Sequence, residues 1–223
     1  ADRAAEAARI VADRVVEAHD AGPDGARGRR AGLMRGMSGP ALFLLRRHER
    51  TGDPDLLQLA RQAIQLDLDR CKTASDGGLQ VDEGRRTMPY LADGSAGVGM
   101  VVDAYLRHAP AAADLEQARE GIRTAATSRF YVQPGLFEGR AGMILHLART
   151  TTPGATADRL AAQVDALDWL SMTYEGHLAF PGHQMMRLSM DLASGTAGCL
   201  LALAAALDPD TGAHLPFLPP LRP

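Results

Sequence analysis

The chain has 223 residues, of which 46% are apolar and only 4% aromatic, and its formal net charge is −3. This length allows one large domain or two small ones, and the many Ala and Leu residues favour packed helices over sheets. The slightly acidic balance argues against nucleic acid or an anionic membrane as the main partner. No apolar run reaches the ~18 residues that suggest a membrane span, and no secretory signal peptide is recognisable. With two cysteines, Cys71 and Cys199, and no disulfide framework, a cytoplasmic location is expected.

The first helix is predicted over residues 2–19, because Ala8, Val11 and Val15 fall on one helical stripe. A loop rich in Gly and Arg follows at residues 21–32.

The second helix is predicted to open at Pro40 and to run to about Arg50. Asp53 and Pro54 suit the N-cap and the first position of a third helix. The remaining helices are predicted at 97–108, 113–127, 142–150, 156–168 and 198–207. They form successive hairpins in which the last helix has no partner after it. That helix is expected to pair with the helix at 2–19 or with something outside the chain.

A segment of the form Gly-x-[Ser/Ala]-Gly precedes an apolar run four times, with first glycines 58, 45 and 56 residues apart. The copies are 36–39, 94–97, 139–142 and 195–198. A repeat on this scale predicts a helical array in which the repeated segments occupy equivalent places. In a purely structural interpretation, the same pattern marks four tight loop-to-helix turns that have no role in binding or catalysis. If the helix starts converge, their free N–H groups and positive dipole ends would suit an anion.

Three long stretches, 73–93, 128–138 and 171–194, are predicted to be irregular and lead into these segments. Long loops in compact domains usually carry function, so we take their polar side chains as candidate substrate-binding residues. These are Asp82, Glu83, Arg85, Arg86, Tyr90, Tyr131, Gln133, Glu138, Gln184, Arg187 and Ser194.

Several loop residues allow a catalytic and a structural interpretation. Asp82 and Glu83 suit acid/base work or are solvated, salt-bridged acids neutralised by Arg85 and Arg86. His183 suits a general acid/base or is an exposed loop histidine. Patterns for zinc, nucleotide phosphates and a serine nucleophile are absent from the sequence, and neither cysteine resembles a nucleophile.

Four long stretches resemble the lanthionine synthetase C-like family, most closely the cyclase domain of class III lanthipeptide synthetases. They are GLMRGMSGPALFLLRRHERTGDP, LQVDEGRRTMPYLADGSAGVGMVVDAYL, RFYVQPGLFEGRAGMILHLA and LAFPGHQMMRLSMDLASGTAGCLLAL, and the resemblance covers roughly residues 5 to 220. Those synthetases combine lyase, kinase and cyclase regions in one actinobacterial chain.

The resemblance implies an all-α fold, an α/α toroid in which about seven inner helices each begin at a Gly-x-x-Gly. Four such starts occur here, so residues 1–223 are expected to form the C-terminal part of a cyclase domain. An apolar toroid edge left open would favour a homo-oligomer.

The family reaction is a Michael-type addition. A cysteine thiol of the dehydrated, leader-bearing precursor peptide attacks a dehydroalanine or dehydrobutyrine of the same peptide, giving lanthionine or the carbon-bridged labionin. The expected partners are therefore this peptide and the lyase and kinase regions of the same synthetase. A nucleotide belongs to the separate kinase region only.

Zinc-dependent relatives hold the metal with a Cys before the third glycine pair and a Cys-His pair before the fourth, where this chain has Phe137-Glu138 and Ala193-Ser194. The resemblance thus implies a zinc-free member, with no cofactor. Where those relatives carry a His ahead of an inner glycine, this chain has Asp93 and Arg35.

We therefore expect Arg35 and Arg140, beside converging helix starts, to stabilise the thiolate and the enolate, while His183 or Asp93 moves the proton. A second interpretation is a catalytically silent scaffold that binds the modified peptide or docks the kinase and lyase regions. A third, a glycosidase-type barrel with Asp82 or Glu83 as the acid, lacks a recognisable second carboxylate.

Overall fold

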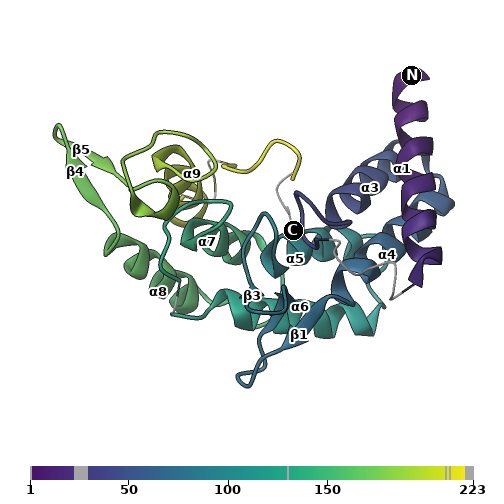
Figure 1. The fold of residues 1–223 in the computed structure, drawn as a ribbon, viewed down its shortest axis with the longest axis horizontal. Coiled ribbons are helices and arrows are strands. Elements are labelled where there is room, and N and C mark those ends of the chain that lie inside the picture. Colours follow the sequence, from purple (N-terminus) through teal and green to yellow (C-terminus); the bar gives the residue numbers. More distant parts are fainter. Residues whose placement is uncertain (1, 23–29, 130, 209, 211, 219–223) are drawn as a thin grey trace.

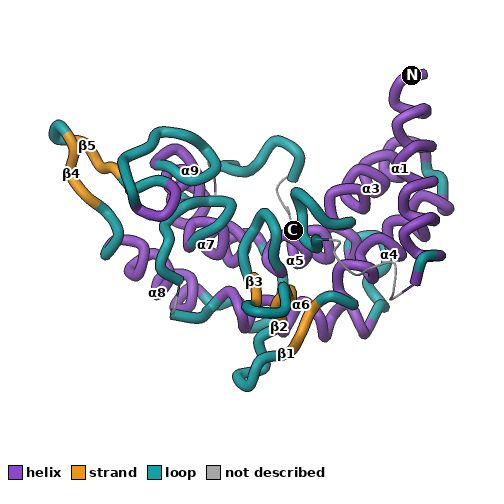
Figure 2. The backbone as a smooth tube through the Cα atoms, in the orientation of Figure 1, coloured by secondary structure: helices purple, strands orange, loops and turns teal. Residues whose placement is uncertain are grey.

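The computed structural model describes residues 2–22, 30–129, 131–208, 210 and 212–218. These residues form α-helices with a few short strands, so the predicted all-α fold is confirmed (Figures 1 and 2). The helices are α1 (Asp2–Asp20), α3 (Ser38–Thr51), α4 (Pro54–Leu68), α5 (Ser95–Leu106), α6 (Ala113–Ala126), α7 (Arg140–Arg149), α8 (Ala157–Asp168) and α9 (Thr196–Leu207). No helix in the described part of the chain is long and apolar enough to cross a membrane.

The helices form hairpins α3–α4, α5–α6 and α7–α8, followed by α9. Helices α3, α5, α7 and α9 pack in succession, and the partner helices α4, α6 and α8 lie along one side of this row (Figure 1). The row curves into an arc, with α1 and α3 at one end and α9 at the other (Figure 1). The closed toroid stays a prediction.

Helix α9 packs against α7 through a face that includes the buried Cys199 and Ala202. Helix α1 instead packs against α3 and α4 at the opposite end, where Val15 is fully buried. The expected alternative in which α9 pairs with the helix at 2–19 is therefore wrong, because the hairpins between them keep the two helices apart (Figure 1).

The four repeated helices begin two residues earlier than predicted. Helices α5, α7 and α9 begin directly after the first glycine, and α3 begins one residue later, at Ser38. Pro40 is consequently the third residue of α3. Proline is tolerated there because first-turn N–H groups have no acceptor within the helix. The predicted start of α4 is confirmed, with the Asp53 side chain accepting a hydrogen bond from the N–H of Asp55.

Two of the three stretches expected to be irregular contain short antiparallel strands. They are β1 (Cys71–Thr73), β2 (Leu79–Asp82) and β3 (Thr87–Met88) in one sheet, and β4 (Met172–Tyr174) and β5 (His177–Ala179) in the other. Glu175 and Gly176 join β4 to β5 with positive φ angles of 50° and 79°, which fits a tight hairpin turn. Cys71 is the first residue of β1. Most of the Gly- and Arg-rich loop at 21–32 lies outside the described residues.

Successive repeats interlock through a leucine that stands three residues before the first glycine. It packs against the second glycine of the next repeat, where an added Cβ would lie within 3.0 Å of the leucine Cβ. The pairs are Leu33–Gly97, Leu91–Gly142 and Leu136–Gly198. Any side chain at these glycines would push the repeats apart, so the glycine is required by packing.

The loops that precede the repeated helices are also hydrogen-bonded in register. The residue concerned stands two positions before the first glycine of each repeat. Its N–H donates a hydrogen bond of 2.9 Å to the C=O of the residue at the same position in the next repeat. The bonds run from Met34 to Ala92, from Ala92 to Phe137 and from Phe137 to Ala193. Residues at matching positions of different repeats are thereby held side by side.

Candidate functional site

The four pre-helix loops surround an open pocket of about 420 Å³. In every repeat the residue directly before the first glycine lines it, namely Arg35, Asp93, Glu138 and Ser194. The other walls are Met34, Ala92, Gln133, Gly135, Phe137, His183 and Ala193. Six of the residues singled out from the sequence therefore lie in one pocket: Arg35, Asp93, Gln133, Glu138, His183 and Ser194.

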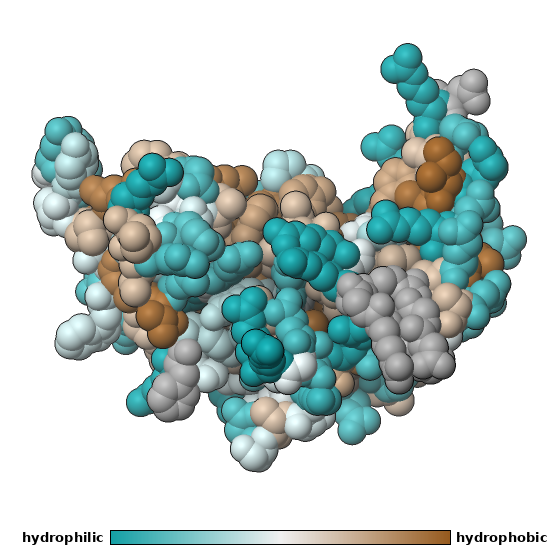
Figure 3. All heavy atoms as spheres, viewed as in Figure 1, coloured by the Kyte–Doolittle hydropathy of each residue, from teal (hydrophilic) through white to brown (hydrophobic). Residues whose placement is uncertain are grey.

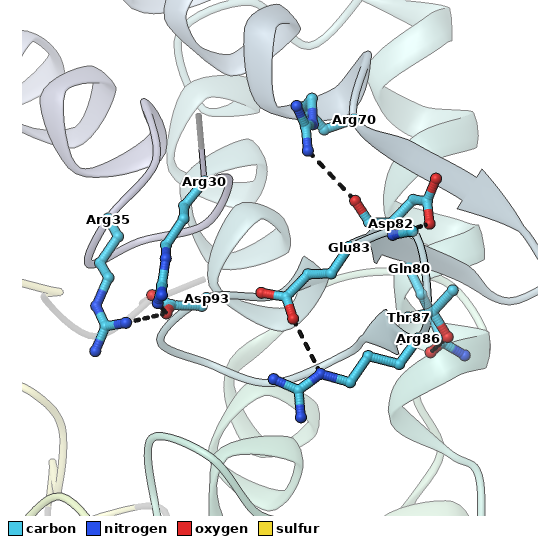
Figure 4. Close-up of polar contacts among 10 residues, drawn as sticks. Arg30, Arg35, Arg70, Gln80, Asp82, Glu83, Arg86, Thr87 and Asp93 are labelled. Atoms are coloured by element: carbon cyan, nitrogen blue, oxygen red, sulfur yellow. Dashed lines mark hydrogen bonds and ion pairs between the residues drawn. The ribbon is translucent and has the colours of Figure 1, made fainter. Parts of the chain in front are cut away.

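Asp93 is 4% exposed and holds two guanidinium groups. Its Oδ2 lies 3.1 Å from Arg30 Nη1 and 3.2 Å from Arg35 Nη1, and Figure 4 shows both arginines converging on it. Its Oδ1 is buried with no hydrogen-bond partner among the described residues. Burial raises the pKa of Asp93, although Arg35 opposes that effect. Asp93 therefore holds Arg35 at the pocket, while its second carboxylate oxygen is buried and unpaired.

His183 enters the pocket from the loop before α9, as the first residue of a 3-10 turn, η1 (His183–Met185). Its Nδ1 lies 4.0 Å from Glu138 Oε2, and its side chain is 64% exposed. Gln184 has a φ of 53°, which is uncommon for a residue with a side chain, and its N–H donates to Gln133 Oε1 at 3.3 Å. The imidazole thus lies at the outer limit of an ion pair with Glu138, beyond hydrogen-bond distance, and is open to a substrate.

Ser194 reaches the pocket from a hydrogen-bonded turn. Its N–H and Oγ donate to the carboxylate of Asp191 at 2.7 and 3.0 Å. The Ser189 hydroxyl binds the same carboxylate, and these bonds lower the pKa of Asp191 to about 2. Asp191 therefore fixes the turn as a permanent anion.

Arg140 does not face the pocket. It is 3% exposed, and its guanidinium donates to Gln163 Oε1 and to the carbonyl oxygens of Arg129 and Tyr131. It therefore ties α7 to α8 and to the preceding loop. Arg140 is not among the pocket walls where we expected it to act, and its Nη donors bind groups inside the fold, while its Nε is buried without a partner among the described residues.

The acids and arginines at the end of β2 and in the turn after it lie outside the pocket walls. Asp82 pairs with Lys72 at 2.6 Å, and the Lys72 contact lowers the pKa of Asp82. Glu83 pairs with Arg86 at 3.0 Å, and Figure 4 shows this pair on the hairpin apart from Asp93. Arg85 is exposed. The salt-bridged interpretation of these loop residues therefore fits better than the acid/base one.

The remaining candidates have structural contacts. The rings of Tyr90 and Tyr131 pack edge to face at 5.8 Å, and Tyr131 Oη donates to the carbonyl oxygen of Ala125. Burial raises the pKa of Tyr131. The carbonyl of Arg187 accepts a hydrogen bond from Gly182 at 2.7 Å, while its side chain is exposed. None of these three side chains lines the pocket.

Several N–H groups at the helix starts are bonded within the protein, which weighs against the anion site that we expected there. At α3, the N–H groups of Met37 and Ser38 donate to the buried carboxylate of Asp67. At α5, α7 and α9, first-turn N–H groups donate to carbonyl oxygens of the loop that doubles back beneath each helix. These bonds run from Ala96 to Pro89, from Ala141 to Pro134 and from Thr196 to Ser189.

The pocket walls carry two carboxylates, one guanidinium and one imidazole, and are not strongly positive. This composition suits proton transfer beside a single cation. Within the described ranges, no three His, Cys, Asp or Glu side chains are grouped so as to hold a metal ion. Burial raises the pKa of both Cys71 and Cys199 to about 12, so neither thiol is suited to act as a nucleophile.

Sequence reasoning missed Arg30 and the apolar wall made by Met34, Ala92, Phe137 and Ala193, of which it considered Phe137 and Ala193 only as replacements for zinc ligands. The four wall residues stand two positions before the first glycine in each repeat. Aligning the repeats position by position reveals this column.

Comparison with known proteins shows that the chain is similar to part of a longer protein. No family model matches it. Over 201 residues, or 88% of its length, the chain is 58% identical to a Streptomyces coelicolor protein named "Probable SapB synthase". The matched region is 21% of that protein, so the chain spans about a fifth of the relative's length.

Proposed function

We propose that this chain is the cyclase portion of a class III lanthipeptide synthetase and forms thioether rings in a dehydrated precursor peptide. The observation that carries the proposal is the pairing of His183 with Glu138 in a pocket that also holds Arg35 and Asp93. The long motifs resembling the cyclase family support it. So does the 58% identity to a segment of a protein named a synthase.

The first step is removal of a proton from the substrate thiol. A cysteine thiol has an ordinary pKa near 8.5, so little thiolate is present at neutral pH. His183 Nδ1 faces Glu138, which leaves Nε2 for the substrate. The imidazole takes the thiol proton, and the Glu138 carboxylate stabilises the imidazolium that results.

The sulfur then adds to the Cβ of the dehydroalanine or dehydrobutyrine. A C–S bond forms, and the π electrons of the C=C bond move to give an enolate on the adjacent carbonyl. The Arg35 guanidinium, held at the pocket by Asp93, donates hydrogen bonds to the enolate oxygen.

Proton return completes the reaction. His183 delivers its proton to the Cα, which gives lanthionine or its methyl derivative with no leaving group. If the enolate attacks a second dehydroalanine first, a C–C bond forms and the negative charge moves to the enolate of that residue, whose Cα then takes the proton from His183 to give labionin. No step uses zinc, and the lyase and kinase regions of the same cytoplasmic synthetase supply the dehydrated peptide.

The test is cyclisation of a pre-dehydrated, leader-bearing peptide. The reaction is monitored by the loss of thiol that an alkylating reagent can modify, and the non-enzymatic rate is subtracted from the observed rate. We expect His183→Ala to lower the enzymatic rate about 10²-fold and Glu138→Gln to lower it less. His177→Ala is the control, because His177 is exposed on β5 and outside the pocket walls. A chelator should leave the wild-type rate unchanged.

If the chain binds the peptide but cyclisation proceeds only at the non-enzymatic rate, the result would favour the scaffold interpretation. Tight, stoichiometric zinc in the purified protein would contradict the zinc-free mechanism.

A further inference from the structure

A small cavity of about 20 Å³ lies between α3, α5 and α7, towards the C-terminal ends of these helices. Of the described residues, none lines both this cavity and the pocket that holds His183. Helix α5 contributes one face, with the three- and four-residue spacing of neighbours on a helix, through Met100, Asp103, Ala104 and Arg107. The other walls are Arg46 of α3, His146 and Arg149 of α7, Thr150 and Leu218.

Several buried nitrogen atoms of these wall residues have no hydrogen-bond partner in the described part of the chain. They are Arg46 Nε, Arg149 Nη2 and both ring nitrogens of His146. His146 is 0% exposed, and its ring lies against α5, where a Cβ added at Gly99 would be 3.0 Å from the imidazole Cε1. A guanidinium group carries only donors, and a neutral imidazole carries one donor and one acceptor. These groups therefore require chiefly an acceptor.

Exposed charges elsewhere on the molecule need no such partner. Figure 3 shows hydrophilic residues across the middle of the molecule, where water can hydrate them. Arginines are also favoured near the C-terminal ends of helices, but the unpartnered nitrogens bind none of the carbonyl oxygens there. Because a buried N–H donor without an acceptor costs free energy, these nitrogens point to a bound group.

The charges at the cavity leave a positive balance. Two carboxylates are shared among three guanidinium groups, in the pairs Arg46–Glu49 at 2.6 Å, Arg107–Glu49 at 3.5 Å and Arg119–Asp103 at 3.4 Å. Among the described residues, Arg149 pairs with no carboxylate, and its Nη1 donates to the carbonyl oxygen of Ala213 at 2.8 Å. Four guanidinium groups thus accompany two carboxylates, which favours an acceptor with negative charge.

We propose that this cavity binds one monovalent anion of about the size of chloride, which accepts hydrogen bonds from Arg46, His146 and Arg149. A space of about 20 Å³ accommodates a particle about as large as one water molecule, so oxyanions such as sulfate are too large. A water molecule carries no charge and would leave the positive balance in place. The anion joins α3 to α7 across α5 and stabilises the fold, independently of the proposed cyclisation.

The test follows thermal unfolding at mildly alkaline pH in sodium chloride and in sodium gluconate of the same ionic strength. At this pH His146 is neutral, because burial lowers its pKa to about 4. Chloride should raise the unfolding midpoint of the wild type by about 4 °C or more and then saturate, because it binds the folded chain. Gluconate is too large for the cavity and should give no saturable rise. Adding the folded protein should also broaden the NMR signal of chloride.

Arg149→Met removes donors from the cavity and should raise the dissociation constant for chloride about tenfold or more. Arg159→Met is the matched control, since Arg159 is exposed on α8 and outside the cavity walls, and should respond to chloride as the wild type does. If Arg149→Met lacks native circular dichroism because it also loses the bond to Ala213, Arg46→Met takes its place.

Equal responses of the wild type to chloride and gluconate would overturn the proposal. So would an undiminished response to chloride in the folded cavity variant. Stabilisation by acetate but not by chloride would instead indicate a site for a carboxylate group, and the proposed chloride-sized ligand would be wrong.

Discussion

The guanidinium of Arg35 lies 3.2 Å from Asp93 Oδ2, and the two residues hold the same position in successive repeats. Register between the pre-helix loops brings them together, since Met34 and Ala92, one residue earlier in each loop, are joined by a backbone hydrogen bond. Arg30 binds the same oxygen at 3.1 Å but does not line the pocket.

The two arginines therefore provide a matched pair of variants. Arg35→Ala should lower cyclisation about 10²-fold, because it removes the donor closest to the developing enolate. Arg30→Ala should lower it far less. Both should change the free energy of unfolding by about 1 kcal/mol or less, because each arginine is about half exposed. Equal losses of activity would mean that both cations act only through Asp93.

Arg140 separates a structural from a catalytic role. Arg140→Met should lower the free energy of unfolding by about 3 kcal/mol, because Gln163 and two carbonyl oxygens lose their donors in the interior. The rate of cyclisation per folded molecule should stay near wild type when measured at low temperature. Arg159→Met, at an exposed position on α8, is the control and should have little effect on stability. A fully folded but inactive Arg140→Met variant would instead indicate that Arg140 takes part in catalysis.

Asp67 fixes the start of α3. Its buried carboxylate accepts hydrogen bonds from the N–H groups of Gly32, Met37 and Ser38 and from the Ser38 hydroxyl. Asp67→Ala should destabilise the protein by about 3 kcal/mol or more in denaturant unfolding, because these donors are left without an acceptor. Asp69→Ala, two residues later and exposed, should cost about 0.5 kcal/mol or less. Similar losses for both would show that the α3 cap contributes little.

His146 should make stability depend on pH. It is fully buried on α7, both ring nitrogens lack partners among the described residues, and burial lowers its pKa to about 4. The unfolded chain binds a proton below pH ~6.5, whereas the folded chain does so only near pH 4, so stability falls as pH decreases across this window.

His146→Leu should remove up to about 3 kcal/mol of this acid destabilisation, as measured by unfolding at a series of pH values. His146 and Asp103 line one small cavity together with three arginines, Arg46, Arg107 and Arg149. Burial raises the pKa of Asp103 to about 6. Asp103 therefore favours the folded state as pH decreases, opposite to His146. Because Asp103 is present in both proteins, its contribution largely cancels in the difference in unfolding free energy between variant and wild type. Parallel stability curves would contradict the buried, neutral state of His146.

The sequence determined the helical class, the repeat and most of the helix positions, because apolar spacing and glycine placement act locally. It also identified the column that contains Arg35, Asp93, Glu138 and Ser194, since the repeats can be aligned by their glycines. His183 was recognised as a candidate from its residue type and loop context alone.

Tertiary structure decided which of these side chains meet. His183 and Glu138 are 45 residues apart and reach each other only through the loop before α9. Arg140 directly follows the first glycine of its repeat but points into the fold, because Gln163 and backbone carbonyl oxygens accept hydrogen bonds from its guanidinium. First-turn N–H groups of α5, α7 and α9 bind their own loops, which double back beneath each helix, and those of α3 bind Asp67 of α4. Local patterns specify which groups are present, and only packing between distant segments specifies which donors and charges remain free to act.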